Sequence, residues 1–203
     1  FMFDGERLIQ HIIKQRYFEE EISNEVNLSY SDNQVTVTTD YLTLIYTLNS
    51  EGYASQCVYS LSSQNRIYQF SYSAEGYLTG IVENIDDTEY SSTSLTYENG
   101  DITSISSKMN GLENKFIYEP GEESSTYHLP CLGLLEIHPL TFHIEALYAG
   151  LLGKDPRHFT MHSCPAGSND EKTVYSYGFD KKGNPSRMIC QTTYAGGQAS
   201  YYP

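Results

Sequence analysis

The chain has 203 residues, of which 39% are hydrophobic and 19% charged, a composition that can bury a core and excludes a disordered chain. The formal net charge is −14, with 26 acidic and 12 basic residues. Because nucleic-acid affinity depends on cations that neutralise phosphates, no nucleic-acid partner is expected. No apolar run approaches the roughly 20 residues that a membrane-spanning helix needs, so the sequence is not expected to span a membrane.

Glycine-centred segments recur along the chain and predict β-hairpins. The segments FSYSAEGYLTGI (70–81) and LTYENGDITSI (95–105) share one pattern, in which aromatic or apolar residues precede a short polar turn with Gly and are followed by Thr and Ile. Related segments contain Gly5, Asn33, Gly52, Gly121 and Gly183. The steps between them, mostly about 20–28 residues, suit two strands and two turns. The repeat therefore predicts an antiparallel meander of about six hairpins.

The turn residues predict two kinds of hairpin loop. Loops that end at Gly52 and Gly76 match a type I turn followed by a residue at positive φ, a position that Asn33 would occupy in a third copy. The dipeptide Asn99–Gly100 is typical of a two-residue type I′ turn. Both loop types join neighbouring antiparallel strands.

Two segments fit helical spacing, and one of them is predicted to be a helix. Ile9–Phe18 is assigned to a strand because β-branched and aromatic residues dominate it. Between Thr141, which can cap a helix, and Gly153, which suits the left-handed position after one, apolar residues recur at i, i+4, i+7 and i+8. A helix is expected at 141–152, where it would cover the apolar face of the sheet; a partner-binding helix is the alternative.

The segments around this helix are expected to be loops. Residues 119–139 and 153–172 are rich in Gly, Pro and Ser, and a last hairpin from Val174 to about Gln191 should return to the same sheet. Together the elements predict a mainly β (α+β) fold, with a large twisted antiparallel β-meander of about 12 strands packed on one α-helix. We expect a single β-rich domain over residues 1–203.

Metal-ligating side chains gather in HFTMHSC, which places His158, His162 and Cys164 within seven residues. Their spacing fits no standard zinc pattern, so ordinary loop residues are preferred and no metal or cofactor is predicted. The cysteines are widely spaced, at Cys57, Cys131, Cys164 and Cys190. Four cysteines allow three pairings, and buried free thiols are preferred over a disulfide.

Candidate catalytic residues are weak. His138 lies two residues from Glu136, and His143 lies two residues from Glu145, but neighbours two apart on a helix do not face each other. Acidic runs such as Glu19–Glu21 could supply the paired carboxyl groups of a glycosidase, yet charge runs more often lie at solvated strand edges or loop tips. No catalytic residue is predicted.

Tyrosine dominates the aromatic residues, with 19 Tyr against 8 Phe and no Trp. Its flat apolar ring with a polar tip suits sugars and protein interfaces, although the absence of Trp counts against a dedicated carbohydrate platform. The residues expected to bind a glycan or a protein are Tyr53, Tyr72, Tyr77 and Tyr97. Cross-strand packing of these rings is the alternative.

The tract LGLLE…ALYAGLLGKDPRHF, followed by YSYGFDKKGNPSRM, resembles the domain-of-unknown-function family numbered 4595. The hairpins also resemble tyrosine–aspartate repeats of large bacterial surface proteins. The resemblance to the family covers nearly the whole chain, and ALYAGLLGK (146–154) is its most specific part.

This resemblance implies an exported protein of gut Bacteroidetes, secreted or of the lipoprotein type, in the periplasm or at the outer membrane or cell surface. The lipid-anchoring Cys of such proteins lies near the mature N-terminus, so an anchor here would precede Phe1. No activity is assigned to the family. The function expected is a non-catalytic envelope module that binds a glycan or a protein. An extracellular glycan hydrolase and a structural envelope component are the alternatives.

Overall fold

The structure, a computed structural model, describes residues 2–17, 20–61, 64–124, 138–168, 170–181, 185–194, 197 and 199–202. In this part of the chain, 15 strands form one sheet in which every strand pairs antiparallel with its neighbours in sequence. The predicted meander is confirmed, with more strands than expected. The strands are β1 (Met2–Asp4), β2 (Arg7–Tyr17), β3 (Glu20–Ser31), β4 (Gln34–Thr38), β5 (Thr43–Leu48), β6 (Ala54–Leu61), β7 (Gln64–Tyr72), β8 (Leu78–Ile85), β9 (Thr88–Glu98), β10 (Asp101–Met109), β11 (Leu112–Ser124), β12 (His158–Pro165), β13 (Lys172–Phe179), β14 (Pro185–Thr193) and β15 (Ala199–Tyr202).

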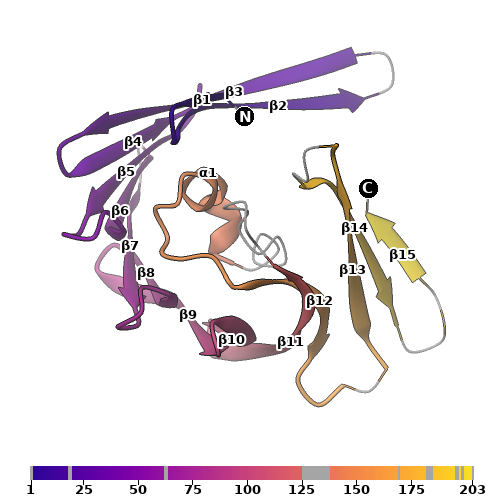
Figure 1. Cartoon of the computed structure of the whole chain (residues 1–203). Helices are drawn as coiled ribbons and strands as arrows, with labels where there is room; N and C mark the ends of the chain where they lie inside the picture. Colours follow the sequence, from indigo (N-terminus) through magenta and orange to yellow (C-terminus); the bar gives the residue numbers. More distant parts are fainter. Residues whose placement is uncertain are drawn as a thin grey trace.

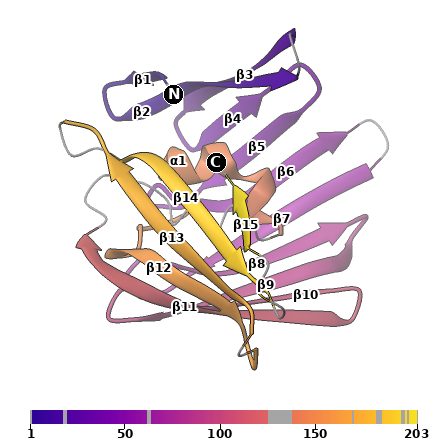
Figure 2. The same cartoon turned by 90° about the vertical axis from the view of Figure 1, so that its right-hand side faces the viewer.

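The sheet curls around a short helix, α1 (Ile144–Tyr148), which lies on its concave side (Figure 1). The right-handed twist that adjacent strands share accumulates over the sheet and produces this curvature. Figure 2 shows β12–β14 on the side of the helix opposite β5–β8. The sheet is open, because β1 and β15 are its two edges and are not paired with each other in the described residues. None of the described helices is both long and apolar enough to cross a membrane.

The glycine turns form as their residue types predict. At the β9–β10 turn, Asn99 and Gly100 have φ of 53° and 90°, and two consecutive positive values define the type I′ turn. At the longer loops, Gly52 and Gly76 have φ of 85° and 92°. Their N–H groups donate to the carbonyls of Asn49 and Ser73, at 3.1 and 3.0 Å.

At three further positions where the sequence predicts a turn, the structure either differs from the expected positive φ or does not describe the residue. Asn33 lies in the two-residue β3–β4 turn between the paired Ser31 and Gln34, and it does not have positive φ. Gly121 lies inside β11, where pairing with β12 carries the strand past the expected turn. Gly183 lies outside the described residues.

The helix expected at 141–152 is much shorter. A 3₁₀ turn covers Leu140–Phe142, and His143, with a φ of −121°, separates this turn from α1. After α1, Gly150 has a φ of 69°, which ends the helical conformation. The apolar stripe is nevertheless buried against the sheet. Four of its members are buried, Leu140, Leu147, Leu151 and Leu152, and Ile144 and Tyr148 are half-buried. The sequence pattern thus identified the buried face correctly, whereas the length of the helix was wrong.

The loop expected at 153–172 is also wrong, because β12 (His158–Pro165) lies within it. This strand pairs with β11, for example Ser163 with Tyr118, and buries the side chain of Phe159. Of the other expected loop, residues 119–124 belong to β11 and 125–137 lie outside the described residues. The strand assignment of Ile9–Phe18 is confirmed as far as Tyr17 by β2, while Phe18 lies outside the described residues. The last hairpin is confirmed by β13 and β14 in the same sheet.

After α1, residues Leu151–Arg157 run across the ends of three successive hairpins, and we call them the crossing segment. The Leu151 carbonyl accepts from the Ala54 N–H at 2.7 Å, the Lys154 N–H donates to Gly76 at 2.9 Å, and the Arg157 N–H donates to Gly100 at 3.0 Å. Three extended residues span about 10 Å, which matches the width of two strands. The hairpin repeat therefore sets the three-residue spacing of these contacts.

Candidate functional site

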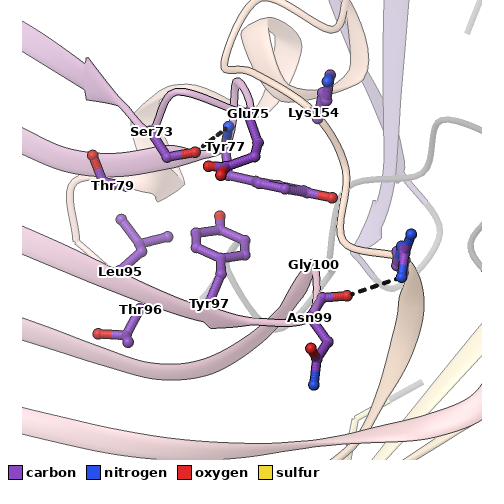
Figure 3. A pocket seen from close by; sticks show the side chains of 11 residues that line it. Ser73, Glu75, Tyr77, Thr79, Leu95, Thr96, Tyr97, Asn99, Gly100 and Lys154 are labelled. Carbon is purple, nitrogen blue, oxygen red and sulfur yellow. Dashed lines mark hydrogen bonds between the residues drawn. The ribbon is translucent and has the colours of Figure 1, made fainter.

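A groove lies where the crossing segment passes over the turns of the β7–β8 and β9–β10 hairpins, and we call it the tyrosine groove. Its volume is about 700 Å³. Figure 3 shows side chains from both hairpins lining it, with Tyr77 and Tyr97 side by side at its centre. The lining residues are Ser73, Glu75, Tyr77, Thr79, Leu95, Thr96, Tyr97, Asn99, Gly100, Lys154 and Arg157.

The two tyrosines come from different hairpins and stack on each other. Tyr77 follows the turn glycine of one hairpin and Tyr97 lies near the end of β9, which pairs with β8. Their ring centroids are 4.9 Å apart and their planes differ by 28°, a stacked arrangement of the kind that contributes about 0.5–1.5 kcal/mol beyond area burial. Both residues are half-buried, so the pair gives the groove a rigid aromatic floor.

The crossing segment adds two cations to this floor. The Lys154 and Arg157 side chains are exposed while their backbone N–H groups are fixed on Gly76 and Gly100. A Cβ at Gly100 would lie 2.7 Å from the Tyr77 hydroxyl and 2.9 Å from Cδ of Arg157. Glycine is therefore what allows the tyrosine and the arginine to meet over this turn.

One carboxylate lines the groove. A hydrogen bond from Ser73 lowers the pKa of Glu75 below its usual range, and the nearby charge of Lys154 acts in the same direction. Glu75 is fully exposed and is ionised at neutral pH. The groove thus combines an aromatic floor, hydroxyl groups, one anion and two cations, a lining that can stack on a ring and hydrogen-bond around it.

The other two tyrosines predicted to bind a ligand lie outside this lining. Tyr53 and Tyr72 stack on each other with centroids 5.3 Å apart. The Tyr72 hydroxyl donates to the carbonyl of Ala54 at 2.6 Å and to that of Leu151 at 3.4 Å, and burial raises its pKa well above the usual value. This pair contacts the start of the crossing segment. A binding role for all four tyrosines stays a prediction.

A second group of polar side chains lies inside the molecule, and we call it the interior cluster: Arg66, Glu83, Ser91 and His138. The fully buried Glu83 accepts from Ser91 at 2.7 Å and binds His138 Nε2 at 2.6 Å and Arg66 at 3.2 Å. Burial opposes its ionisation, but the hydrogen bonds and positive partners outweigh burial and lower the pKa of Glu83.

The interior cluster does not have the order of a nucleophilic triad. In such a triad the hydroxyl is bonded to the histidine that removes its proton. Here the hydroxyl of Ser91 and the ring of His138 both bind the carboxylate of Glu83. The serine is therefore not bonded to the histidine, and the arrangement stabilises a buried negative charge.

His143 lies buried beside this cluster. Its Nδ1 is 2.8 Å from the Tyr46 hydroxyl, and the rings of Tyr46, Tyr68 and Phe70 pack around it edge-on. Burial lowers the pKa of His143 to about 3, so the imidazole is neutral in the folded protein at neutral pH. The predicted neighbour Glu145 instead binds His11 at 3.0 Å.

The other histidine candidates pair with carboxylates that sequence proximity did not indicate. His138 binds Glu83, as described, while Glu136 lies outside the described residues. His158 binds Asp101 and His162 binds Glu119, each at 2.9 Å. Within the described ranges, no group of three or more His, Cys, Asp or Glu is placed to hold a metal ion.

Three of the four cysteines are described, and Cys57 and Cys164 are free thiols. Cys57 and Cys190 are buried and Cys164 is half-buried, while Cys131 lies outside the described residues. Burial raises the pKa of Cys57 to about 12, so this thiol is protonated and packs as an apolar side chain.

Sequence reasoning missed the charged residues of the tyrosine groove. Lys154 and Arg157 were assigned to a loop with no role, and Glu75 was read as a turn residue. The available signal was the three-residue spacing of these two cations in GKDPR. This spacing indicates a contact only when it is compared with the hairpin repeat, because three extended residues cover the same distance as the width of two strands.

The comparisons with known proteins agree with the sheet. A family model described as a domain of unknown function (DUF4595) with porin-like fold matches residues 4–187. The solved structure of a porin-like protein from Bacteroides uniformis is 28% identical in sequence with a TM-score of 0.85, over 97% of this chain and 82% of that one. No curated protein matches the chain.

Proposed function

We propose, from the premise that this chain belongs to the family of domains of unknown function with a porin-like fold, that it is a non-catalytic module which binds a glycan in the tyrosine groove. The observation that carries the proposal is the stacked pair of Tyr77 and Tyr97 at the floor of a groove of about 700 Å³. Ser73, Thr79 and Thr96 also line the groove. Stacking on a ring face combined with hydrogen bonds around it is what a pyranose offers a protein.

A peptide ligand is less well suited to this groove. Peptides commonly bind by adding a strand to an exposed sheet edge. The groove lies over β7–β10, and each of these strands is already paired on both sides. A peptide would have to bind through side chains alone, whereas a sugar needs no strand edge.

Binding is preferred over hydrolysis because of the carboxylates. Glycoside hydrolysis generally needs two of them, one with a raised pKa that acts as general acid. Among the described residues that line the groove, Glu75 is the single carboxylate, and its pKa is lowered rather than raised. This pattern supports ligand retention without cleavage.

The proposal also covers the location of the protein in the cell and its domain organisation. The likeness to a porin-like protein supports an exported protein of the periplasm, outer membrane or cell surface. The single sheet that contains all described strands supports one domain over residues 1–203.

The test is calorimetric titration with a panel of neutral and acidic oligosaccharides, using the wild type, Tyr77→Ala and Tyr41→Ala. Tyr41 is 85% exposed and lies outside the groove, which makes it a matched control. At least one oligosaccharide should bind, and Tyr77→Ala should weaken it by about tenfold or more, the effect of losing a central aromatic contact. Tyr41→Ala should bind like the wild type, and overnight incubation should leave the oligosaccharide length unchanged. Equal binding by both variants, or no binding by the wild type, would contradict the proposal.

A further inference from the structure

Two cations overhang the tyrosine groove in a strongly acidic molecule. The chain has 12 basic residues against 26 acidic ones, yet the groove lining contains Lys154 and Arg157 against the single carboxylate Glu75. Both cations are exposed and come from the crossing segment, which hydrogen bonds fix to the turns beneath. The groove is thus a local reversal of the overall charge.

Neither cation forms a salt bridge with a described carboxylate, although Lys154 lies near enough to Glu75 to lower the pKa of that carboxyl. Other basic residues form salt bridges, Arg66 with Glu83 and Lys172 with Glu119, but Lys154 and Arg157 form none with any residue that the structure describes. Arg157 donates one Nη1–H to the carbonyl of Asn99 at 3.3 Å. A guanidinium has five N–H donors, and this bond uses one of them.

The position of the cations is set by the backbone. The Cβ that any other residue would add at Gly100 meets the Arg157 stem at 2.9–3.0 Å, and one at Gly76 would lie 3.5 Å from Cε of Lys154. The stems of both cations therefore rest on turn glycines. This places their charged ends beside an aromatic floor, where an anionic substituent on a stacked ring would be found.

We infer that the tyrosine groove takes a saccharide that carries an anionic group, a carboxylate or a sulfate ester, with the ring stacked on Tyr77 and Tyr97 and the anion held by Lys154 and Arg157. This inference rests on the proposed function and names the class of glycan. Arginine forks bind oxyanions through two parallel N–H bonds, and lysine adds a point charge.

The test is calorimetric titration at low salt with four probes: a galacturonic acid tetramer, the same tetramer after reduction of its carboxyl groups, a sulfated galactan tetramer and a short poly-glutamate. The proteins are the wild type, K154Q/R157Q and K108Q/K115Q. Lys108 and Lys115 are exposed on β10 and β11, away from the groove. The last variant therefore removes the same charge elsewhere.

The wild type should bind the carboxylated or the sulfated tetramer at least about tenfold more tightly than the reduced one, and the stronger of the two identifies the anion. K154Q/R157Q should lose about tenfold of that affinity, while K108Q/K115Q should lose less than about twofold. Equal affinity for the reduced and acidic tetramers, with unchanged binding by K154Q/R157Q, would overturn the inference and leave the glycan module standing. Binding of poly-glutamate alone would overturn the saccharide assignment, and binding of none of these probes or of the oligosaccharide panel would overturn both proposals.

Discussion

The interior cluster and the tyrosine groove each combine one glutamate with basic side chains, but they differ in how many of these charged groups have a partner within the protein. Inside, Glu83 is fully buried and has three protein partners within 3.2 Å. At the groove, Lys154 and Arg157 are exposed and form no salt bridge with a described residue. Charged groups that are paired inside the protein stabilise the fold, whereas cations without a described salt-bridge partner in a groove are available to a ligand.

The difference also shows that a perturbed pKa does not locate function here. The larger shifts belong to His143 and to buried tyrosines around it, and burial is the first cause of each. At the groove, the pKa of the fully exposed Glu75 is lowered, and a hydrogen bond from Ser73, not burial, is the main cause. Perturbed groups often gather at active sites, but structural networks perturb them as well, and the geometry of Ser91, Glu83 and His138 is that of a structural network.

The largest expected loss of stability follows from a substitution that breaks the interior cluster. Glu83→Gln keeps the side-chain size and removes the charge that Arg66 and His138 share. Breaking a buried ion pair typically costs about 3–5 kcal/mol, and we expect about 3 kcal/mol because Arg66 and His138 are 20% and 30% exposed. For a chain of this length, the melting temperature should fall by about 6–12 °C.

The matched control for this substitution is Glu75→Gln at the groove, which should change the free energy of unfolding by less than about 0.5 kcal/mol. Urea unfolding of both variants measures the two values. A loss below about 1 kcal/mol for Glu83→Gln would mean that the buried charge is not held by its partners in the way the geometry indicates.

The next effect tests the crossing segment that joins the interior to the groove. Gly153 has a φ of 90°, and a Cβ there would lie 2.7 Å from the Gly76 carbonyl oxygen. Gly150 has a φ of 69° with nothing within 4 Å of such a Cβ. Gly150→Ala should therefore cost about 1 kcal/mol for the left-handed backbone, and Gly153→Ala about 3 kcal/mol, since the clash adds to the backbone cost. Equal losses in urea unfolding would show that the crossing segment is not packed on the turn.

Local features of the fold could be predicted from the sequence, while contacts between distant segments could not. The turns at Gly52, Gly76 and Asn99–Gly100 follow from the φ that each residue type tolerates, so a short stretch contains the whole signal. β12 was missed because its strand character comes from pairing with β11, about 45 residues earlier, and Pro156 and Pro165 suggested a loop. The helix at 141–152 was predicted too long because the apolar stripe reports burial, and an irregular segment can bury the same side chains.

The same limit applies to the groove. The chemistry of tyrosine predicts a binding role for Tyr77 and Tyr97, but they lie together because β8 and β9 are neighbours in the meander. Nothing local separates them from Tyr53 and Tyr72, which stack in the same way but contact the crossing segment. Lys154 and Arg157 were missed because they reach the groove through hydrogen bonds to residues 78 and 57 positions earlier, counting 154 − 76 and 157 − 100.

A third prediction concerns the pH dependence of stability, which we expect to come from the buried His143 beside the interior cluster. Burial lowers the pKa of His143 to about 3, against about 6.5 in the unfolded chain. Between these values the unfolded chain binds a proton that the folded chain does not, so stability is complete above about pH 6.5 and decreases as the pH falls towards 3. From pH 7 to pH 5 the free energy of unfolding should fall by about 2 kcal/mol.

Urea unfolding at pH 7, 6 and 5 measures this dependence, and His143→Gln, which cannot titrate, should remove most of it. His158→Gln is the control, because His158 is partly exposed at the surface beside Asp101. A wild type with the same stability at pH 7 and pH 5 would show that His143 becomes protonated without leaving its site.

The smallest expected change in stability follows from a substitution at the groove. Lys154→Gln removes an exposed charge whose backbone N–H, not its side chain, holds the crossing segment on Gly76. Exposed substitutions away from caps and networks usually change stability by less than about 0.5 kcal/mol, so the melting temperature should stay within about 2 °C of the wild type. Differential scanning calorimetry measures it. A larger loss would mean that the lysine side chain is part of the structural network, and it would then belong with Glu83 rather than with the groove. An unchanged melting temperature together with weakened binding of an acidic saccharide would separate the two regions, because a residue of the interior cluster cannot change without cost to the fold.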